Sequence, residues 1–306
     1  MTRDNKRKDA ATVTSNGTGA VGDVVADKDA VVDGAADKDV PGAEDGAGAE
    51  DGATPPIIEM RGLEKAYGER LVLKGIDMEV RPGTVTCVLG DNGAGKSTLI
   101  KALSGLHQPT GGEMLIDGEP ARLRNPKDAL DRGIATVYQD LAVVGQMSVW
   151  RNFFLGQEIT GALGRLKADE MREITAEQLQ KMGVNLPDVE VPISTLSGGQ
   201  RQVVAIARAV YFGARVLILD EPTAALGVKQ SGMVLRFVKK ARESGVAVIF
   251  ITHNPHHAYL VGDRFMMLNM GEQVMNADLE DVTLEELTVE MSGGGELDAL
   301  SHELRS

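Results

Sequence analysis

The stretch from Gly90 to Thr98, which reads GDNGAGKST, has the residue types of a loop that binds phosphate. It follows the apolar, β-branched residues 84–89 and precedes residues 99–103, which are spaced as in a helix. Glycines let the backbone bring its N–H groups close to an anion, and a helix N-terminus adds unpaired donors and a positive dipole end. Lys96 would contact the β- and γ-phosphates, and the Ser97 hydroxyl would bind Mg²⁺. The stretch therefore predicts a site for a nucleoside triphosphate, whose expected contacts are Gly90, Asp91, Asn92, Gly93, Ala94, Gly95, Lys96, Ser97 and Thr98.

Two adjacent carboxylates, Asp220 and Glu221, follow the apolar residues 216–219. These residues have the pattern of a buried strand, and open α/β sheets place their chemistry at the carboxyl ends of strands. The same two acids also fit an ordinary turn. His253 comes just after a second expected strand, 246–252.

Two further features leave alternatives open. The histidines at 253, 256 and 257 allow a metal cluster, although Pro255 separates them and no cysteine lies nearby. Tyr67 precedes the phosphate loop and could stack on an adenine ring or be an ordinary tyrosine at a strand end.

A second helix N-terminus opened by glycine, Ser197 to Gln200, is also suited to holding an anion.

Apolar periodicity predicts alternating strands and helices, which is typical of an α/β fold. The expected strands cover 57–60, 72–80, 84–89, 113–116, 134–137, 216–219 and 246–252, with a small strand pair after Asp263. Gly68 and Gly75 are expected to break the first strands. The expected helices cover 126–132, 149–155, 168–181, 201–210, 230–244 and 284–291. Trp150, Phe153 and Phe154 would lie in a core or, alternatively, on an exposed face for a partner.

Composition limits the class of protein. The formal net charge of −13 argues against nucleic acid as a partner, and the single cysteine, Cys87, excludes an internal disulfide framework. No apolar run reaches the roughly 18 residues that span a bilayer, and the start of the chain lacks the apolar segment of a signal peptide. A cytosolic location is therefore expected. Residues 1–54 are acidic and of low complexity, which predicts disorder, and residues 293–306 are expected to be a flexible tail.

The motifs GDNGAGKST, Gln139, LSGGQ, VLILDEP and His253 stand in one order along the chain. Together they resemble the ATP-binding subunit of ABC transporters over residues 57 to 292. The resemblance implies a P-loop NTPase fold with a RecA-like core, an N-terminal antiparallel β subdomain and an inserted helical subdomain at about 141–212. The ATPase domain as a whole would cover residues 55–292.

The resemblance also implies a role for each motif residue. Tyr67 would stack on adenine, and Lys96, Gln139, Glu221 and His253 would be the catalytic residues, with Glu221 as the general base. Glu221 would polarise the attacking water, and His253 would contact the γ-phosphate. Mg²⁺ would be held by Ser97, Gln139 and, through water, Asp220. The ATP of a second subunit would be contacted by Ser197, Gly198, Gly199 and Gln200.

Within that family, the segments GIATVYQDLAVVGQMSVWRNFFLGQE and EPTAALGVKQSG are similar to the importers of ribose, xylose and fructose. Two departures stand out. Many members of that group carry two ATPase modules in one chain, and this sequence has one phosphate loop and one LSGGQ, which predicts pairing with a second copy of itself. Gly227 stands where most ABC ATPases have an aspartate that helps couple the two ATP sites.

The resemblance implies an ATPase of a sugar importer, with ATP and Mg²⁺ as cofactors, at the cytoplasmic face of the membrane. Its expected partners are permease subunits, contacted through Gln139 and residues 147–154, and, indirectly, a periplasmic or lipid-anchored sugar-binding protein. Two alternatives are the ATPase of an importer for another small solute and a soluble ABC ATPase of translation or DNA repair. The second usually has tandem modules or a long coiled-coil insertion, which this sequence lacks.

Overall fold

The computed structural model describes residues 54–184 and 186–292, and these carry two sheets. The expected tails at 1–54 and 293–306 therefore lie outside the described residues, apart from Thr54. The first sheet is antiparallel, and its strands are ordered β2 (Arg70–Val80), β1 (Ile58–Tyr67), β4 (Gly111–Ile116) and β5 (Glu119–Pro120).

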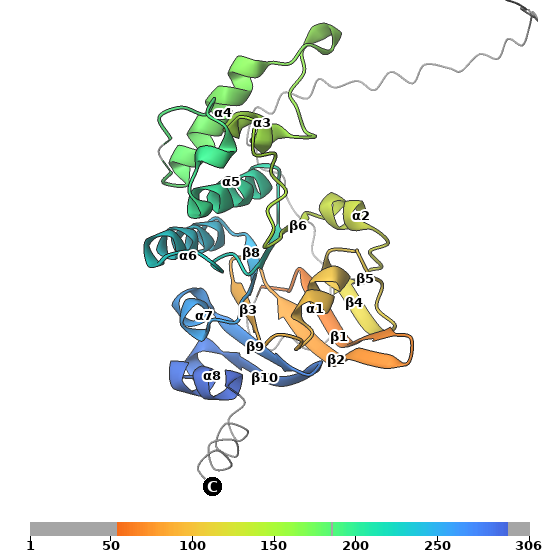
Figure 1. Ribbon diagram of the computed structural model, residues 1–306. Helices are drawn as coiled ribbons and strands as arrows, with labels where there is room; N and C mark the ends of the chain where they lie inside the picture. The colour runs from red at the N-terminus through yellow and green to blue at the C-terminus, as the bar shows by residue number, and fades with distance from the viewer. Residues whose placement is uncertain (1–53, 185, 293–306) are drawn as a thin grey trace, which may run out of the picture. The chain divides into compact units, whose positions relative to one another are not determined.

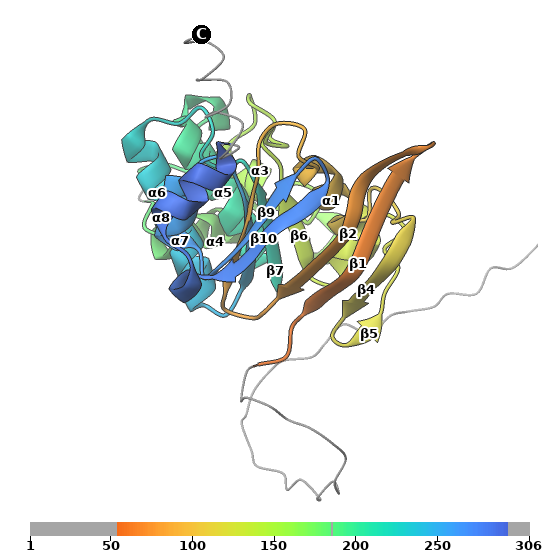
Figure 2. The same cartoon turned by 90° about the horizontal axis from the view of Figure 1, so that it is seen from below.

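The second sheet has six strands and is parallel except for one edge strand. Their order is β10 (Glu272–Asp278), β9 (Arg264–Asn269), β3 (Val85–Leu89), β8 (Ala247–Ile251), β7 (Val216–Asp220) and β6 (Ile134–Val137). All residues of β3 and β8 are buried, because the antiparallel sheet and one helix pack on one face of this sheet and further helices pack on the other. In Figure 2, β2, β1, β4 and β5 lie to one side of β9 and β10, and helices α5 to α8 lie to the other.

Eight α-helices complete the described part of the chain (Figure 1). They are α1 (Lys96–Leu103), α2 (Pro126–Asp131), α3 (Val149–Phe154), α4 (Ala168–Lys181), α5 (Gly198–Tyr211), α6 (Val228–Glu243), α7 (Pro255–Val261) and α8 (Leu284–Met291). The expected strands and helices are confirmed in type, and Asn125 caps α2 by accepting a hydrogen bond from the Asp128 N–H, as the sequence predicts. The predicted α/β fold class is therefore correct.

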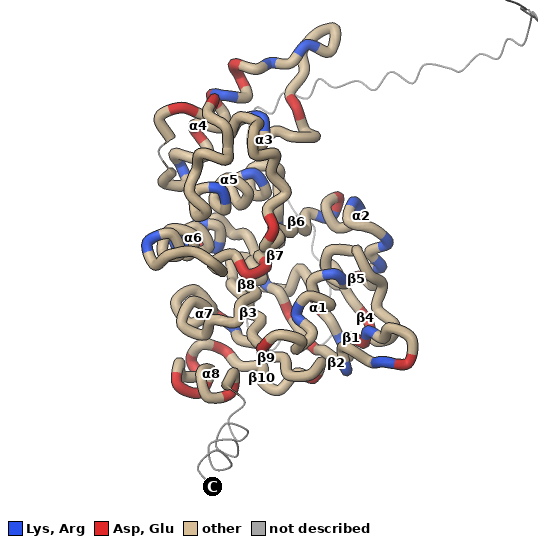
Figure 3. Tube along the Cα trace, viewed as in Figure 1, with Lys and Arg blue, Asp and Glu red and all other residues tan. Residues whose placement is uncertain are grey.

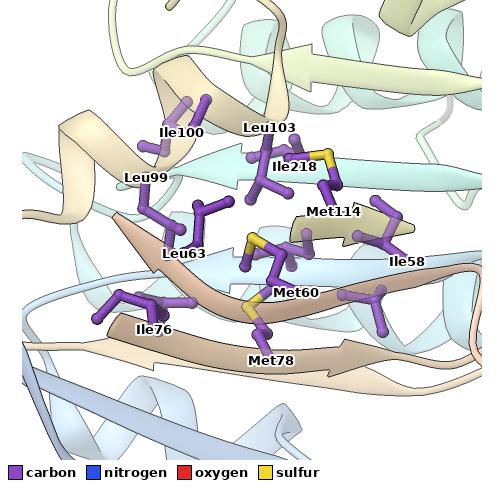
Figure 4. Close-up of a cluster of buried hydrophobic side chains, with 14 of the residues drawn as sticks. Ile58, Met60, Leu63, Ile76, Met78, Leu99, Ile100, Leu103, Met114 and Ile218 are labelled. Atoms are coloured by element: carbon purple, nitrogen blue, oxygen red, sulfur yellow. The ribbon is translucent and has the colours of Figure 1, made fainter. Parts of the chain in front are cut away.

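Helix α1 joins the two sheets through one hydrophobic core. Figure 4 shows Leu99, Ile100 and Leu103 of α1 facing side chains of the antiparallel sheet and Ile218 of β7. The other labelled members of this core are Ile58, Met60, Leu63, Ile76, Met78 and Met114. Burial of such side chains contributes about 1.5–3 kcal/mol each. The core therefore fixes the helix that begins at the phosphate loop.

Helices α3, α4 and α5 share a separate core and are grouped at one end of the ribbon in Figure 1. Trp150, Phe153 and Phe154 are at most 2% exposed. Trp150 still satisfies its indole N–H, which donates to Glu190 at 2.9 Å. The interpretation of these aromatic residues as core is therefore confirmed, and they offer no exposed face to a partner.

Acidic residues gather on α8, as Figure 3 shows. Glu285 and Glu286 lie in its first turn, where negative charge interacts favourably with the helix dipole. Glu286 also accepts a hydrogen bond from the Thr283 N–H at 2.7 Å, and this forms a capping box. These contacts explain why a short helix with one fully buried residue, Leu287, begins at this position.

One sequence expectation about strands was wrong. Gly75 does not break its strand, because β2 continues through it with a positive φ of 74° and a shift in register against β1. The expected strand pair after Asp263 is present as the antiparallel strands β9 and β10, and β9 also pairs in parallel with β3, which joins the pair to the main sheet. Helix α7 was not expected at all.

Candidate functional site

The phosphate loop leaves the buried strand β3 and enters α1 at Lys96. Gly90 has a φ of 147°, and a Cβ there would lie 2.4 Å from the Leu268 carbonyl oxygen. Gly95 is the N-cap of α1, with a φ of 112°, and a Cβ there would lie 2.9 Å from the Leu73 side chain. Both positions require glycine for conformation and for space. The sequence thus builds a tight turn in front of a helix N-terminus.

A distant glycine supports this loop and was missed by the sequence analysis. Gly271, in the turn between β9 and β10, donates its N–H to the Ala94 carbonyl at 2.9 Å, and its own carbonyl accepts from the Lys74 N–H at 2.9 Å. A Cβ on Gly271 would lie 2.1 Å from the Val72 oxygen. In the sequence, the pair Met270-Gly271 indicates only a turn. Its support of the phosphate loop could not be predicted, because the residues that Gly271 contacts are distant along the chain.

Lys96 lies across the loop and is 8% exposed. Its Nζ donates to the carbonyl oxygens of Gly90 at 2.7 Å and Asp91 at 3.0 Å. Burial lowers the pKa of Lys96, and the negative charges of Glu221, Asp91 and Asp220 oppose that shift. A cation is therefore held within the loop and in the field of the carboxylates that follow β7.

Asp220 ends β7, and Glu221 is the next residue, as the sequence predicts. Burial and the charge of Glu221 raise the pKa of Asp220, whereas Lys96 lowers it. Glu221 has a φ of 47°, in the left-handed region that non-glycine residues seldom occupy, and its N–H donates to the Ile251 carbonyl at 2.9 Å. Strained residues of this kind concentrate at functional sites.

His253 and Glu221 are in direct contact, although they follow different strands. The His253 Nδ1 lies 2.8 Å from Glu221 Oε1, and Thr252 donates its hydroxyl to Glu221 Oε2 at 3.4 Å. The Glu221 side chain is 12% exposed and that of His253 is 58% exposed. The pair therefore places a nearly buried carboxylate beside an accessible imidazole, which suits proton transfer to or from a bound molecule.

The segment Ser197 to Gln200 opens α5 with a capping box. Ser197 Oγ accepts the Gln200 N–H at 3.3 Å, and Gln200 Oε1 accepts the Ser197 N–H at 2.9 Å. A Cβ on Gly198 would lie 2.8 Å from Leu226, and one on Gly199 would lie 3.0 Å from Gln230. Among the residues that the structure describes, no hydrogen bond joins this segment to the phosphate loop.

Tyr67 and Gln139 are both accessible. Tyr67 ends β1 and is 41% exposed, and its hydroxyl lies 3.3 Å from His107 Nδ1. Lys65 places its Nζ 5.0 Å from the centre of the tyrosine ring. Gln139 is exposed and is the second residue after the end of β6. Neither side chain hydrogen-bonds to the phosphate loop in the described ranges.

The predicted magnesium ligands are a hydroxyl, an amide and a carboxylate, from Ser97, Gln139 and Asp220. Ser97 is exposed in the first turn of α1, and Asp220 is half-buried beside Lys96. Oxygen ligands of this kind fit Mg²⁺, which binds few protein ligands and keeps several waters. The donor set therefore fits the ion.

The three histidines do not form a metal cluster. Within residues 54–184 and 186–292, no group of three or more His, Cys, Asp or Glu side chains could hold a metal ion. His253 is paired with Glu221, and His257 Nδ1 lies 2.9 Å from the Thr223 hydroxyl. Cys87 is buried, and burial raises the pKa of its thiol, which suits a core residue.

Gly227 is the N-cap residue of α6, and because it has no side chain, the helix lacks a side-chain hydrogen bond at this end. Its φ is −71°, and a Cβ there would meet no atom within 4 Å. Gly227→Asp is therefore expected to fit without displacement and to stabilise the fold by a few tenths of a kcal/mol through capping, measured by thermal or urea unfolding. Gly227→Ala is the matched control and should destabilise it slightly. Destabilisation by the aspartate would contradict the open geometry.

No helix in the described part of the chain is both long and apolar enough to cross a membrane.

Comparisons with known proteins agree on one family. The ABC transporter family model matches residues 73–224. The xylose/arabinose import ATP-binding protein of Sulfolobus acidocaldarius is 40% identical over 236 residues, which are 77% of this chain and 94% of that protein. The fructose import ATP-binding protein of Rhizobium meliloti is 40% identical over 251 residues, 80% of this chain and 96% of that one. A ribose import ATP-binding protein of Escherichia coli O157:H7 is 37% identical, and the match covers 47% of its length.

Solved structures lead to the same fold. The cbiO1 protein of Clostridium perfringens, described as part of the ABC transporter complex cbiONQ, superposes with a TM-score of 0.65 at 27% identity. That match covers 82% of this chain and all of the other. A dimeric bacterial ABC transporter cassette superposes with a TM-score of 0.62 at 27% identity, over 72% of this chain and 98% of the cassette. The chain therefore belongs to the ABC transporter family, among its ATP-binding proteins.

Proposed function

We propose that this chain is the ATP-hydrolysing subunit of an importer for a simple sugar. The contact between Glu221 and His253, in the field of Lys96 and Asp220, carries the hydrolytic part of the proposal. The sugar part rests on relatives that are named for import of xylose, arabinose and fructose and that this chain matches over 94% and 96% of their length. The subunit would work at the cytoplasmic face of the membrane.

Each residue has a role that follows from its surroundings. Lys96 would exchange its contacts with loop carbonyls for phosphate oxygens, and the free N–H groups at the start of α1 would bind the same phosphates. Tyr67, at its exposed strand end, would stack on the adenine ring. Mg²⁺, held by Ser97, Gln139 and Asp220, would neutralise charge on the phosphates. These contacts would fix the triphosphate over the carboxyl ends of β3 and β7.

Hydrolysis would require an oriented water molecule. Glu221 would accept a hydrogen bond from that water and take its proton as the water oxygen bonds to the γ-phosphorus. The bond from that phosphorus to the bridging oxygen would break, and ADP and phosphate would leave. His253 would donate a hydrogen bond to the γ-phosphate while it remains beside the carboxylate.

A second copy of the chain would complete the site. Ser197, Gly198, Gly199 and Gln200 form the N-terminus of a long helix that suits an anion, and they make no hydrogen bond to the phosphate loop in the described residues. A dimeric solved cassette supports the idea that they serve the nucleotide of the partner. Two ATP molecules would then be held between two copies.

A cavity of about 340 Å³ offers a contact for the permease. Tyr138 and Leu141, on either side of exposed Gln139, line it together with Ala142 and Arg208. Arg208 donates to the Leu155 carbonyl at 2.6 Å, and burial lowers its pKa, which Glu158 opposes. Because α3 keeps its aromatic side chains in the core, we place the contact in this cavity and at Gln139 rather than along residues 147–154.

Copurification tests this contact. The tagged chain, extracted with mild detergent from cells that make it, should retain a permease with several membrane spans. Ala142 is exposed and lines the cavity, so Ala142→Glu should reduce the recovered permease at least fivefold and leave ATP affinity unchanged. The matched control is Lys229→Glu on the exposed face of α6. Equal recovery with both variants would rule out the cavity, and no permease with the unaltered chain would contradict the transport function.

A further inference from the structure

Thr223 and His257 form a hydrogen bond between two elements of the site. The Thr223 hydroxyl lies 2.9 Å from His257 Nδ1. Thr223 is 5% exposed and lies two residues after Glu221, and His257 is the third residue of α7. The bond therefore joins the loop that carries the candidate base to the helix that follows the second strand of the site.

The backbone of His257 is held in place at the start of α7. Asn254 caps α7 by accepting the His257 N–H at 3.1 Å, and Pro255 occupies the first helical position. Asn254 in turn donates its N–H to Thr252 Oγ1 at 3.1 Å. Because Ala258 and Val261 bury the inner face of α7, the backbone of His257 is held in place with the helix.

The loop from Glu221 to Gly227 needs such a support. Glu221 and Ala225 both have positive φ angles, 47° and 58°, in a stretch of five residues. Each such residue is strained and persists only where its surroundings hold it. The loop has few internal bonds of its own, from the Ala224 N–H to the Glu221 carbonyl at 3.0 Å and from the Leu226 N–H to the Thr223 carbonyl at 3.4 Å. In the part of the chain that the structure describes, the hydrogen bond from Thr223 to His257 joins the centre of this loop to α7.

We propose that His257 is a positioning residue for hydrolysis, which holds Thr223 and thereby fixes the orientation of the Glu221 carboxylate. The inference rests on the proposed function, because it assumes that Glu221 is the base. The phosphate loop follows β3, a different strand, and contains neither residue of the pair, so the contact should act on turnover and not on nucleotide binding.

The bond acts between uncharged groups. Burial lowers the pKa of His257, and the neighbouring imidazoles of His256 and His253 lower it further. A neutral imidazole at neutral pH can donate to or accept from a hydroxyl, according to its tautomer. A side chain with an amide at the same place can do both as well, and this makes asparagine the conservative replacement.

Steady-state ATP hydrolysis by the full chain with Mg²⁺ tests the proposal. His257→Ala is expected to lower kcat at least fivefold and to change KM for ATP by less than twofold. Thr223→Val keeps the shape of threonine without its hydroxyl and should produce the same loss. The double variant should lose no more than either single one, because both remove the same bond. His257→Asn and Thr223→Ser should recover at least half of the wild-type kcat.

Controls separate this role from a structural one. His256→Ala, on the exposed neighbour, should leave kcat unchanged. Thermal unfolding and the affinity for a non-hydrolysable ATP analogue should match the unaltered chain for Thr223→Val. The proposal is overturned by additive losses in the double variant, by equal changes in kcat and KM, or by failure of the asparagine to restore activity. An unaltered chain that binds ATP but never hydrolyses it would instead overturn the proposed function.

Discussion

Glu221→Gln should abolish ATP turnover and leave ATP binding intact. Glutamine keeps the size of the side chain and an oxygen that can accept from Thr252, but it cannot take a proton from water. Loss of a general base costs about 10²- to 10⁴-fold in rate. The ATP-bound dimer should therefore accumulate. Phosphate release measures ATP turnover, and size-exclusion chromatography with Mg²⁺ and ATP measures the amount of ATP-bound dimer.

The matched control is Glu243→Gln, on the exposed end of α6, which should hydrolyse ATP at the wild-type rate. Turnover within tenfold of wild type in Glu221→Gln would remove Glu221 from the role of base. Loss of ATP binding in the same variant would show that the carboxylate mainly supports the phosphate loop through its interaction with Lys96.

Lys96→Ala should remove most of the affinity for ATP. The ammonium group is the buried cation of the loop, and a hydrogen bond to a charged group contributes about 1.5–3 kcal/mol. Since about 1.4 kcal/mol corresponds to a factor of ten, the dissociation constant should rise about 10- to 100-fold. Calorimetric titration with ATP measures it directly.

Lys101→Ala is the control, because Lys101 lies on the exposed face of the same helix. It should bind ATP as the unaltered chain does. If Lys96→Ala bound ATP within twofold of wild type while its unfolding was unchanged, the loop would not be the phosphate site.

The sequence predicted the parts of the site that are local in the chain. The turn before Lys96 needs glycine at positions 90 and 95 because both residues have positive φ angles, and the local motif predicts this need. The atoms of Leu268 and Leu73 that a Cβ would meet there are distant along the chain, so the sequence did not predict those contacts. The position of Glu221 after a buried strand was also predictable, because four apolar residues lead directly to the two acids. The fold class followed from the same alternation of strands and helices.

The parts that were missed depend on contacts between distant residues. No residue near Gly271 in the sequence indicates that it supports the phosphate loop, and the place of β9 between β10 and β3 depends on pairing with a strand far away in the chain. Helix α7 is short and contains Pro255, so periodicity gave no signal for it. His257 was noticed only as a possible metal ligand, whereas its partner is a hydroxyl 34 residues away. Contacts of this kind depend on which strands lie next to each other in the sheet, and the periodicity of apolar residues does not predict the order of the strands.

The roles of the residues in catalysis and in the dimer stay predictions. The most direct test of the proposed sugar import is to find which solute stimulates ATP hydrolysis. The measurement is ATP hydrolysis by the chain reconstituted in proteoliposomes with its permease and binding protein, across a panel of solutes. We predict that ribose, xylose, arabinose or fructose raises the rate at least threefold over the complex without solute, and that amino acids and nucleosides do not. Stimulation by an amino acid or a nucleoside, with none by any sugar, would contradict the assignment.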